Sequence, residues 1–420
     1  MDVRTVPLDQ LDVITAKLYG EHGYPHEAWT RLRRESPVNW CQPPGYKPFW
    51  AVTKHADITE VSTQPEKFRS FGRFILFPEM AEGSGPSLEE QPPLRMLVNM
   101  DPPEHRDYRK LVSNWFTPRA IARLEARLED ITREIFDDLA KDGGVYECDF
   151  VRDVAALQPL RMITEILGIP REREPFVLKV TNENFGIEDP DFQRPGDRRE
   201  DRLGFLQEAF AFLSEITDDR RKHPRNDLSS VLANATLNGE AVPTFELFSL
   251  YFLVMVAGHD TTRNAISSGL LALLEHPREL EKLRNNPNLI ETGADEIVRW
   301  TTPVNHFSRT ATVDYRLRDK HIKKGDSVAL FYASANRDED VFPDPFAFRL
   351  DRDPNPHLGF GVGEHFCLGA HLARLDLKVF FRQFAERLEA IELTDPVQLL
   401  HASFVGGPKR VPIRYRFKPA

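Results

Sequence analysis

The chain has 420 residues, of which 41% are hydrophobic, so it is long enough to bury a sizeable core. Its 55 basic and 65 acidic residues give a formal net charge of −10, which argues against general nucleic-acid binding because that needs a net basic face. We find no Gly/Ser-rich linker and no repeating period, and therefore expect a single domain over residues 1–420.

The N-terminus and the cysteines indicate a cytoplasmic protein. Residues 1–20 mix charged and apolar side chains and contain no apolar stretch typical of a signal peptide or membrane anchor. The three cysteines, Cys41, Cys148 and Cys367, show no close pairing, which suits a reducing compartment. Each cysteine alone is more simply a buried thiol than a ligand, so its context must decide.

In chain order, the predicted elements describe a helix-rich α+β protein with small peripheral sheets. A strand is expected over 48–53, a helix from His55, and an irregular loop over 71–91, a length that usually indicates a functional or mobile segment. Helical patterns dominate from 103 to 296, including an amphipathic helix over 119–139. Strand patterns return at these ranges: 315–322, 327–332 and 402–417.

One long helix is predicted between Pro243 and Pro277, because no proline interrupts this stretch of roughly 50 Å. Its first half is apolar all round, and polar residues then appear together from Gly258 to Arg263. One interpretation is a helix that emerges into solvent there. The other is a kink or π-bulge that opens a polar notch in an apolar pocket, where a hydroxyl beside a carboxylate relays protons.

The segment His357–Arg374, HLGFGVGEHFCLGAHLAR, carries the strongest pattern in the chain. Glycines at alternate positions before Cys367 permit positive φ angles and close backbone approach to a flat object. A helical stretch follows Gly369, so Cys367 lies near a helix N-terminus, which stabilises a thiolate. A zinc site is disfavoured because His365 is close but no second ligand pair is evident. If Cys367 were only a buried structural thiol, the spaced glycines around it would have no explanation.

The run from Phe360 to Gly369, FGVGEHFCLG, resembles the haem-binding signature of the cytochromes P450. Three further motifs of that family occur in the expected order: DPPEHRDYR (101–109), AGHDTT (257–262) and EIVR (296–299). The phrases SANRDED, HLGFG and FVGGPKRVPIR further resemble the soluble terpineol-hydroxylating P450s of bacteria. The resemblance implies the P450 fold, mainly α, a triangular prism with a long central helix and small sheets.

The resemblance also implies a haem b cofactor and the residues that bind it. Cys367 would be the ligand of the iron, with the backbone near Gly369 directed at its sulfur, Phe360 packed beside it and Ala257 close to the other haem face. The haem propionates would be bound by these residues: His105, Arg109, Arg309 and His365. Phe307 stands where some relatives place another polar propionate contact.

On the opposite face of the haem, Asp260 and Thr261 would deliver protons during dioxygen activation. Glu296 and Arg299 are expected to pair with an arginine further along, either Arg349 or Arg352. The expected walls of the substrate site are Val256, Ala257, Val304, Asn305, Phe404 and Val405, closed by residues 71–97 and 181–193. Asn305 or His259 could orient a substrate hydroxyl, although for His259 we favour a surface-side or water-bound position on the helix.

The implied activity is hydroxylation of a small hydrophobic molecule, a monoterpenoid or aromatic hydrocarbon. Electrons would come from a 2Fe–2S ferredoxin served by an NAD(P)H-dependent reductase, through a basic patch of Arg106, Lys110, Arg374 and Lys378, each of which could equally be an ordinary solvated charge. The alternatives are a larger substrate such as a steroid or fatty acid, a peroxide-using enzyme, and a non-catalytic haem protein. No membrane or nucleic acid is expected as a partner.

Overall fold

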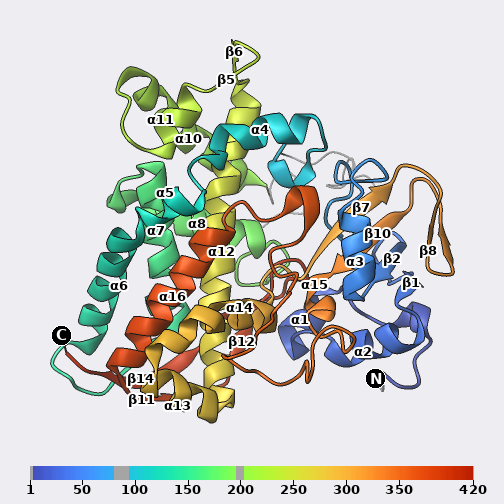
Figure 1. The fold of residues 1–420 in the computed structure, drawn as a ribbon. Helices are drawn as coiled ribbons and strands as arrows, with labels where there is room; N and C mark the ends of the chain where they lie inside the picture. The colour runs from blue at the N-terminus through green and yellow to red at the C-terminus, as the bar shows by residue number, and fades with distance from the viewer. Residues whose placement is uncertain (1–2, 80–93, 195–202, 420) are drawn as a thin grey trace.

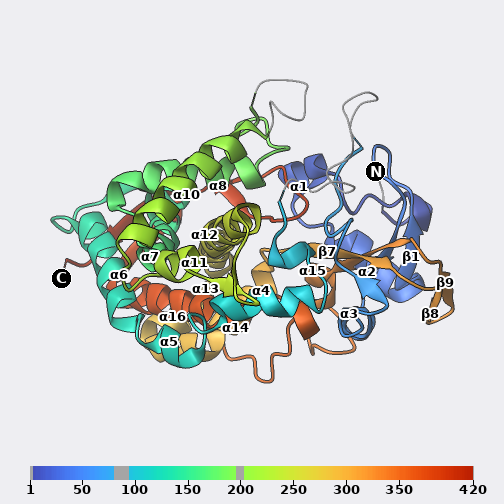
Figure 2. The same ribbon diagram turned by 90° about the horizontal axis from the view of Figure 1, so that it is seen from above.

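A single long helix, α12 (Thr244–Glu275), passes through the middle of the molecule (Figure 1). The coordinates are a computed structural model that describes residues 3–79, 94–194 and 203–419. Pro243 caps the helix and Pro277 begins the next one, so the two prolines set its ends as expected. In the view along its axis, other helices surround α12 on one side and strands lie on the other (Figure 2).

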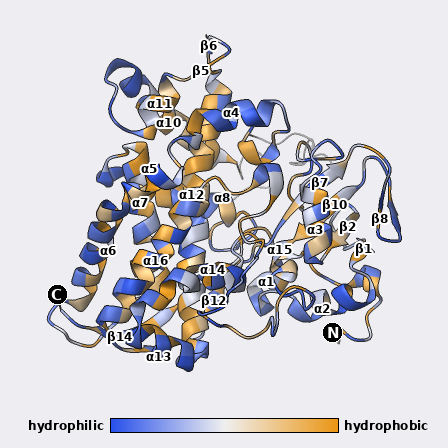
Figure 3. Ribbon diagram, in the orientation of Figure 1, coloured by the Kyte–Doolittle hydropathy of each residue, from blue (hydrophilic) through white to orange (hydrophobic). Residues whose placement is uncertain are grey.

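The helices around α12 bury it because its surface is apolar over most of its length (Figure 3). Its partners are α7 (Leu157–Leu167), α8 (Glu174–Phe185), α14 (Ile290–Thr301) and α16 (Ala370–Arg387). The remaining α-helices are α1 (Ala16–His22), α2 (His26–Glu35), α3 (His55–Ser62), α4 (Glu104–Ser113), α5 (Pro118–Ala122), α6 (Glu125–Ala140), α10 (Gly204–Lys222), α11 (Leu228–Ala233), α13 (Pro277–Asn285) and α15 (Tyr332–Ala335).

The largest sheet has the strand order β1-β2-β10-β7-β3 and lies beside the helical part. Its central strand β10 is buried at all five positions, SVALF, and pairs in parallel with β2 and antiparallel with β7. Its strands are β1 (Val38–Cys41), β2 (Phe49–Val52), β3 (Phe68–Arg69), β7 (His306–Ala311) and β10 (Ser327–Phe331). The smaller sheets contain β4 (Tyr146–Asp149), β11 (Leu388–Leu393) and β14 (Pro412–Phe417); β12 (Gln398–Leu399) and β13 (Pro408–Arg410); β5 (Thr236–Leu237) and β6 (Glu240–Ala241); β8 (Tyr315–Leu317) and β9 (Lys320–Ile322).

The structure confirms most of the predicted elements and corrects two. The predicted helix over 119–139 is two helices, because α5 ends at Ala122 and α6 begins at Glu125. The predicted π-bulge in the long helix is also wrong, since α12 is α-helical throughout, whereas the kink stays a prediction. Part of the predicted 71–91 loop, from residue 80 onward, lies outside the described residues. Among the described residues, no helix is long and apolar enough to cross a membrane.

Glu296 on α14 anchors a buried ionic cluster that joins this helix to the chain before the cysteine segment. Arg299 donates to both carboxylate oxygens, at 2.7 and 2.8 Å, and both side chains are fully buried. Arg352 approaches the same carboxylate at 3.1 Å and donates to the carbonyls of Pro343 and Ala347. The third member of the cluster is therefore Arg352, because Arg349 offers only its backbone N–H and pairs its side chain with Asp351.

We expect Arg352→Leu to lower the free energy of unfolding by about 3–5 kcal/mol, because it breaks a buried ion pair and leaves carbonyl groups unpaired. The matched control is Arg349→Leu, which removes a half-exposed side chain and should cost under about 1 kcal/mol. Urea unfolding of both variants measures the difference. Equal losses for the two variants would contradict the assignment.

Candidate functional site

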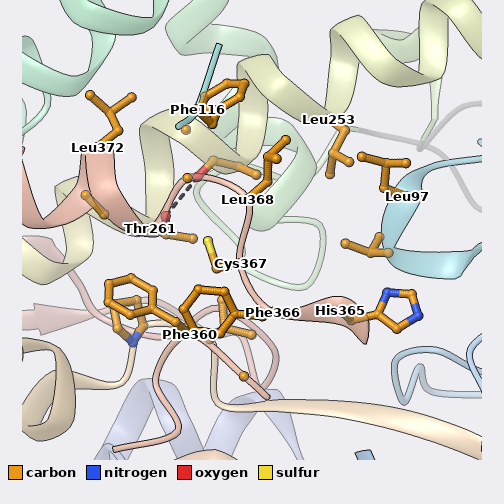
Figure 4. Close-up of a pocket in the computed structure, with 18 of the residues that line it drawn as sticks. Leu97, Phe116, Leu253, Thr261, Phe360, His365, Phe366, Cys367, Leu368 and Leu372 are labelled. Carbon is orange, nitrogen blue, oxygen red and sulfur yellow. Dashed lines mark hydrogen bonds between the residues drawn. The ribbon is translucent and has the colours of Figure 1, made fainter. Parts of the chain in front are cut away.

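Cys367 opens onto an enclosed cavity of about 240 Å³ between α12 and the loop that precedes α16. Figure 4 shows the view into this cavity, with Cys367, Phe360, Phe366 and His365 on the loop side and Thr261 on α12. The cavity is lined mainly by apolar side chains, and its few polar groups come from α4, α12, β7, α15, α16 and the loop. The sequence pattern placed these segments together correctly.

The glycines of the loop are needed for its shape. Gly361 and Gly363 adopt φ angles of 68° and 78°, in the region that disfavours side chains. A Cβ on Gly363 would also lie 2.7 Å from the carbonyl oxygen of Ser62. The loop is closed by the backbone N–H of Cys367, which donates to the carbonyl of Phe360 at 2.9 Å. The cysteine is thereby fixed in position before α16 begins.

Open space surrounds the cysteine loop on the cavity side. A Cβ built on Gly369 would meet no atom within 4 Å, although Gly369 has an ordinary φ of −87°. Conformational freedom therefore does not explain this glycine. A flat group lying against the backbone at Gly369 would explain it, as the spacing of glycines predicted.

Burial controls the ionisation of Cys367. It raises the pKa of the thiol, while the backbone N–H of Gly369 and the guanidinium groups of Arg109 and Arg374 lower it. Because burial outweighs these three, the protein alone favours the neutral thiol. A thiolate at this position therefore requires a further positive charge next to its sulfur, and a bound metal ion supplies one.

Four basic side chains gather at one side of the cavity: His105, Arg109, Arg309 and His365. The rings of His105 and His365 lie 4.3 Å apart, and the charge of Arg309 together with burial lowers the pKa of His365 to about 2. Neither ring nitrogen of His105 has a hydrogen-bond acceptor among the described residues, although Glu364 lies 3.5 Å away.

The unsatisfied ring nitrogens of His105 and the two guanidinium groups fit a ligand that carries carboxylates. Arg309 is 4% exposed and donates only to the carbonyl of Ser308 in the described structure. Two carboxylates placed between the histidines and arginines would pair each of these groups. Together with the open face at Gly369 and the buried Cys367 sulfur, the cluster fits iron protoporphyrin IX.

Across the cavity, Thr261 places its hydroxyl group on the α12 wall, where it donates to the carbonyl oxygen of Ala257 at 2.8 Å. The neighbouring Asp260 is fully buried and points away from the cavity toward Arg263, with an ion-pair distance of 2.5 Å. Arg263 continues to Asn182 on α8, at 2.6 Å, and Asn182 lines a groove on the surface. Burial raises the pKa of Asp260 and Arg263 opposes the rise.

Two features of α12 differ from expectation. His259 is fully buried, so the predicted surface-side position is wrong, and it does not line the cavity either. Burial lowers its pKa to about 3, and the ring is therefore neutral. Gly258 is explained by close packing, because a Cβ there would lie 2.8 Å from the side chain of Ile163 on α7. The polar residues of this half-helix therefore serve packing and the Asp260 network, not solvent exposure.

A second cavity, of about 180 Å³, adjoins the first at α12. The two cavities share Ala257, Thr261, Val304 and Phe307 among their walls. Five of the six predicted substrate-site residues line the second cavity: Val256, Ala257, Val304, Phe404 and Val405. A β-bridge between Val304 and Val405 holds the two loops together.

The sixth predicted residue, Asn305, does not line this cavity. Its amide is fully buried and donates to the hydroxyl of Tyr19 at 2.6 Å and to the carbonyl of Ser403 at 3.0 Å. Asn305 therefore lies behind the cavity wall and stabilises it through these two hydrogen bonds. Phe74, Phe77 and Phe185 line the cavity and lie in the two ranges, 71–97 and 181–193, that were expected to close the site. Sequence reasoning missed Phe205 and Phe252. Of these two, Phe252, one turn before Val256 on α12, could have been found from helical spacing.

Residues 13–413 match the family model described as Cytochrome P450. The chain is a cytochrome P450. Among its relatives, "Cytochrome P450-terp" of Pseudomonas sp is 38% identical over 96% of each chain. "Steroid C26-monooxygenase" of Mycolicibacterium smegmatis is 35% identical over 99% of this chain and 96% of the relative.

A solved P450 structure has the same fold. Mycobacterium marinum cytochrome P450 CYP268A2, in complex with pseudoionone, superimposes with a TM-score of 0.85 at 34% identity, covering 97% of this chain and 99% of that one. The family uses haem b, and this P450 is accordingly a haem-dependent monooxygenase. The fold predicted from the motifs is confirmed.

Asp376, on α16, is a buried carboxyl group of this P450 that no motif indicated. It is 2% exposed and lines the cysteine cavity. Gln158 on α7 donates to its carboxylate at 3.2 Å and itself accepts from Thr132 at 2.7 Å. Burial raises the pKa of Asp376 to about 7, against the opposing effect of Gln158.

We expect the contribution of Asp376 to the stability of the protein to fall as the pH rises from about 4 to 7. The folded state keeps the proton of Asp376 up to about pH 7, whereas the unfolded chain releases it near 3.8. At about 1.4 kcal/mol per pH unit, the free energy of unfolding loses at most ~4 kcal/mol from this group. Asp376→Asn removes this loss, so its advantage over the wild type should grow from pH 4.5 to pH 8.

Urea unfolding at several pH values measures this effect. Asp314→Asn is the control, because Asp314 is exposed and its variant should keep the pH dependence of the wild type. Parallel pH curves for wild type and Asp376→Asn would show that Asp376 is ionised in the folded protein.

Proposed function

We propose that this P450 hydroxylates a small hydrophobic molecule, a monoterpenoid or an aromatic hydrocarbon, with dioxygen and electrons from a 2Fe–2S ferredoxin. The observation that carries the proposal is the junction of the two cavities at Ala257 and Thr261. One cavity has the cysteine and the cationic cluster, and the other is apolar and aromatic. A molecule in the second cavity therefore has its nearest carbon atoms at the haem site.

The size of the substrate cavity supports a small substrate. Its described residues enclose about 180 Å³, less than the ~300–1,000 Å³ of sites for drug-sized ligands. The relative named P450-terp and the neighbour crystallised with pseudoionone agree with a compact terpenoid. The named steroid monooxygenase and a related "Methyl-branched lipid omega-hydroxylase" keep the larger substrate as the second candidate.

In this proposal Cys367 is the thiolate ligand of the iron and donates electron density to it. The N–H of Gly369 and the ring of Phe360, which stacks under Arg374 at 4.5 Å, surround the sulfur. His105, Arg109, Arg309 and His365 bind the two propionates, and Ala257 leaves room on the opposite face. When bound, haem supplies the iron at which dioxygen is activated and one oxygen atom is transferred to a C–H bond.

Thr261 and Asp260 have separate tasks in proton supply. The hydroxyl of Thr261 lies at the junction of the cavities and holds a proton close to the reacting atoms. Arg263, held by Asn182, fixes the Asp260 carboxyl group in place beside Thr261 in the chain, and Asp260 exchanges protons with water for delivery to the site. Its raised pKa favours this role, because a buried carboxyl group that holds its proton is also able to release it.

The proposed ferredoxin surface is the outer face of the molecule next to the cysteine loop, with residues from α4 and α16. Its four basic residues each have an acidic neighbour: Arg106 with Glu364, Lys110 with Asp107, Arg374 with Asp295 and Lys378 with Glu291. Exposed pairs of this kind contribute little to stability, so the carboxylates of an acidic ferredoxin can replace the internal partners. Salt should therefore weaken the complex.

A ligand panel tests the size of the substrate. We expect a monoterpene alcohol and an alkylbenzene to shift the haem of the holoenzyme from low to high spin, by displacing water from the iron, and a steroid to leave it unchanged. Absorption titrations measure the shift, and turnover with a ferredoxin and its reductase gives the product. A response to the steroid alone would contradict the small-substrate proposal.

Thr261→Ala should uncouple the enzyme, because the hydroxyl that holds the proton is lost. We expect NAD(P)H consumption to continue while peroxide replaces most of the hydroxylated product. Thr261→Ser keeps a hydroxyl at the same position and is the control, which should stay coupled. The ratio of product to NAD(P)H consumed measures the effect, and unchanged coupling in Thr261→Ala would remove Thr261 from the mechanism.

A further inference from the structure

The buried carboxyl groups of this P450 share a feature that Asp376 lacks. Eight acidic side chains are buried among the described residues, and seven of them form an ion pair with a lysine or an arginine. The seven are Asp57, Asp189, Asp227, Asp260, Glu279, Glu296 and Asp338. Asp376 has no cationic partner in the described part of the chain. A buried carboxylate without a cation is costly, so Asp376 favours its neutral form.

The hydrogen bonds of Asp376 leave a place for a proton. Nε2 of Gln158 donates to the carboxyl oxygen Oδ1 of Asp376 at 3.2 Å and to its main-chain carbonyl oxygen at 2.9 Å. The main-chain contact orients the amide of Gln158, which therefore donates to Asp376 and does not accept from it. Oδ2 has no hydrogen bond to a described residue, so it is the oxygen that can carry the proton. Burial raises the pKa of Asp376 to about 7, and Gln158 opposes this rise.

The position of Asp376 brings it into the haem site. It is the one acidic side chain among the described residues that line the cysteine cavity. Leu372, one turn before Asp376 on α16, and His365 lie on opposite sides of Cys367 (Figure 4). The basic side chains around His105 therefore do not neutralise Asp376, in agreement with their absence from the causes of its shifted pKa.

The other charged groups around α16 are paired with one another. The pairs join α16 to α14 and α6: Arg374 with Asp295, Lys378 with Glu291 and Arg382 with Glu129. From α7 the facing group is the neutral Gln158, and the side chains with which α12 lines the cavity are uncharged. The helices α5 and α13 also contact α16, and none of their charged groups affects the pKa of Asp376.

A one-electron reduction of a haem bound in this cavity changes the charge next to Asp376. In the ferric state the charge of the iron is balanced by the porphyrin and the thiolate, and reduction leaves one unbalanced negative charge. In a cavity with little water, such a charge acts strongly on a carboxyl group in the wall. It makes the carboxylate form of Asp376 less favourable and therefore raises the affinity of this group for a proton.

We propose that Asp376 couples proton uptake to electron transfer in this enzyme. When the bound haem iron gains one electron from a one-electron donor, the carboxylate of Asp376 binds one proton from solvent at its free oxygen atom. The net charge of the cavity then stays constant, and reoxidation releases the electron and the proton together. Asp376 thereby sets the reduction potential of the iron without binding it. This inference uses the haem but neither the proposed substrate nor the ferredoxin.

Redox titration of the substrate-free holoenzyme from pH 6 to pH 9 tests the coupling. We expect the midpoint potential of the wild type to stay level below about pH 7 and to fall above it, because reduction must then take up the proton. A tenfold rise in proton affinity on reduction corresponds to a total fall of about 59 mV. Asp376→Asn is neutral at every pH and should keep the high potential throughout.

Two control variants accompany this titration. Asp376→Glu keeps a carboxyl group and should keep the fall, whereas the exposed control Asp314→Asn should follow the wild type. Other titrating groups, such as the propionates, contribute equally to the wild type and to Asp376→Asn, so the difference between these two curves isolates Asp376. Parallel curves for the two proteins would overturn the proposal.

Proton counting tests the same step in the wild type itself. Electrochemical reduction at pH 8 in weakly buffered solution with an indicator dye should consume up to one proton per electron in the wild type, and close to none in Asp376→Asn. The reduced-minus-oxidised infrared spectrum should show a new carboxylic acid C=O band that Asp376→Asn lacks. Reduction of the wild type without proton uptake, or a band that persists in Asp376→Asn, would overturn the proposal.

The outcomes are separate from those of the proposed function. Circular dichroism and the carbon monoxide spectrum identify a variant that does not fold, and the proton count of the wild type then decides. Because no substrate or ferredoxin is present, a negative result leaves the proposed hydroxylation intact. A failed ligand panel would, in turn, leave the role of Asp376 unchanged.

Discussion

The rest of this site depends on a negative charge on the sulfur of Cys367, which the folded chain alone does not favour. Burial of Cys367 raises the pKa of its thiol, and the nearby N–H of Gly369 and the guanidinium of Arg109 do not fully offset this effect. The chain therefore builds a position for a sulfur anion and leaves part of its stabilisation to the cofactor. The basic cluster around His105 has the complementary need, because burial and the neighbouring arginines lower the pKa of both imidazole rings and carboxylates between these groups would offset that effect. One ligand with a metal ion at its centre and two carboxylate groups satisfies both requirements.

Much of this arrangement could be predicted because short local sequence patterns specify it. The alternating glycines before Cys367 have backbone angles and contacts that exclude side chains, so a short stretch of sequence specifies the loop. The two prolines around α12 determined its length for a similar reason. The choice between Arg349 and Arg352 could not be made, because both lie at a similar separation from Glu296 and only the folded turn decides which side chain faces inward.

The errors occurred where a side chain's direction depends on distant neighbours. Asn305 was expected in the substrate wall, but Tyr19, far away in the chain, provides a buried partner that turns the amide backward. His259 was expected near solvent, but it lies on a side of α12 that neighbouring elements cover completely. The ranges 71–97 and 181–193 were expected at the substrate site, but which of their side chains line the cavity, and the contribution of Phe205, appear only in the three-dimensional structure.

The contact between Gly258 and Ile163 has a consequence for how such enzymes can change. Because no side chain fits between α12 and α7 at this point, the central helix can neither slide nor rotate without a collision. This contact therefore fixes the spacing of α12 and α7 about one turn before Thr261, the residue proposed to hold a proton for the reaction. The substrate cavity has no such fixed reference, since its walls come from helix ends and loops. Evolution can thus retune the choice of molecule in that cavity while the oxidative machinery keeps its alignment.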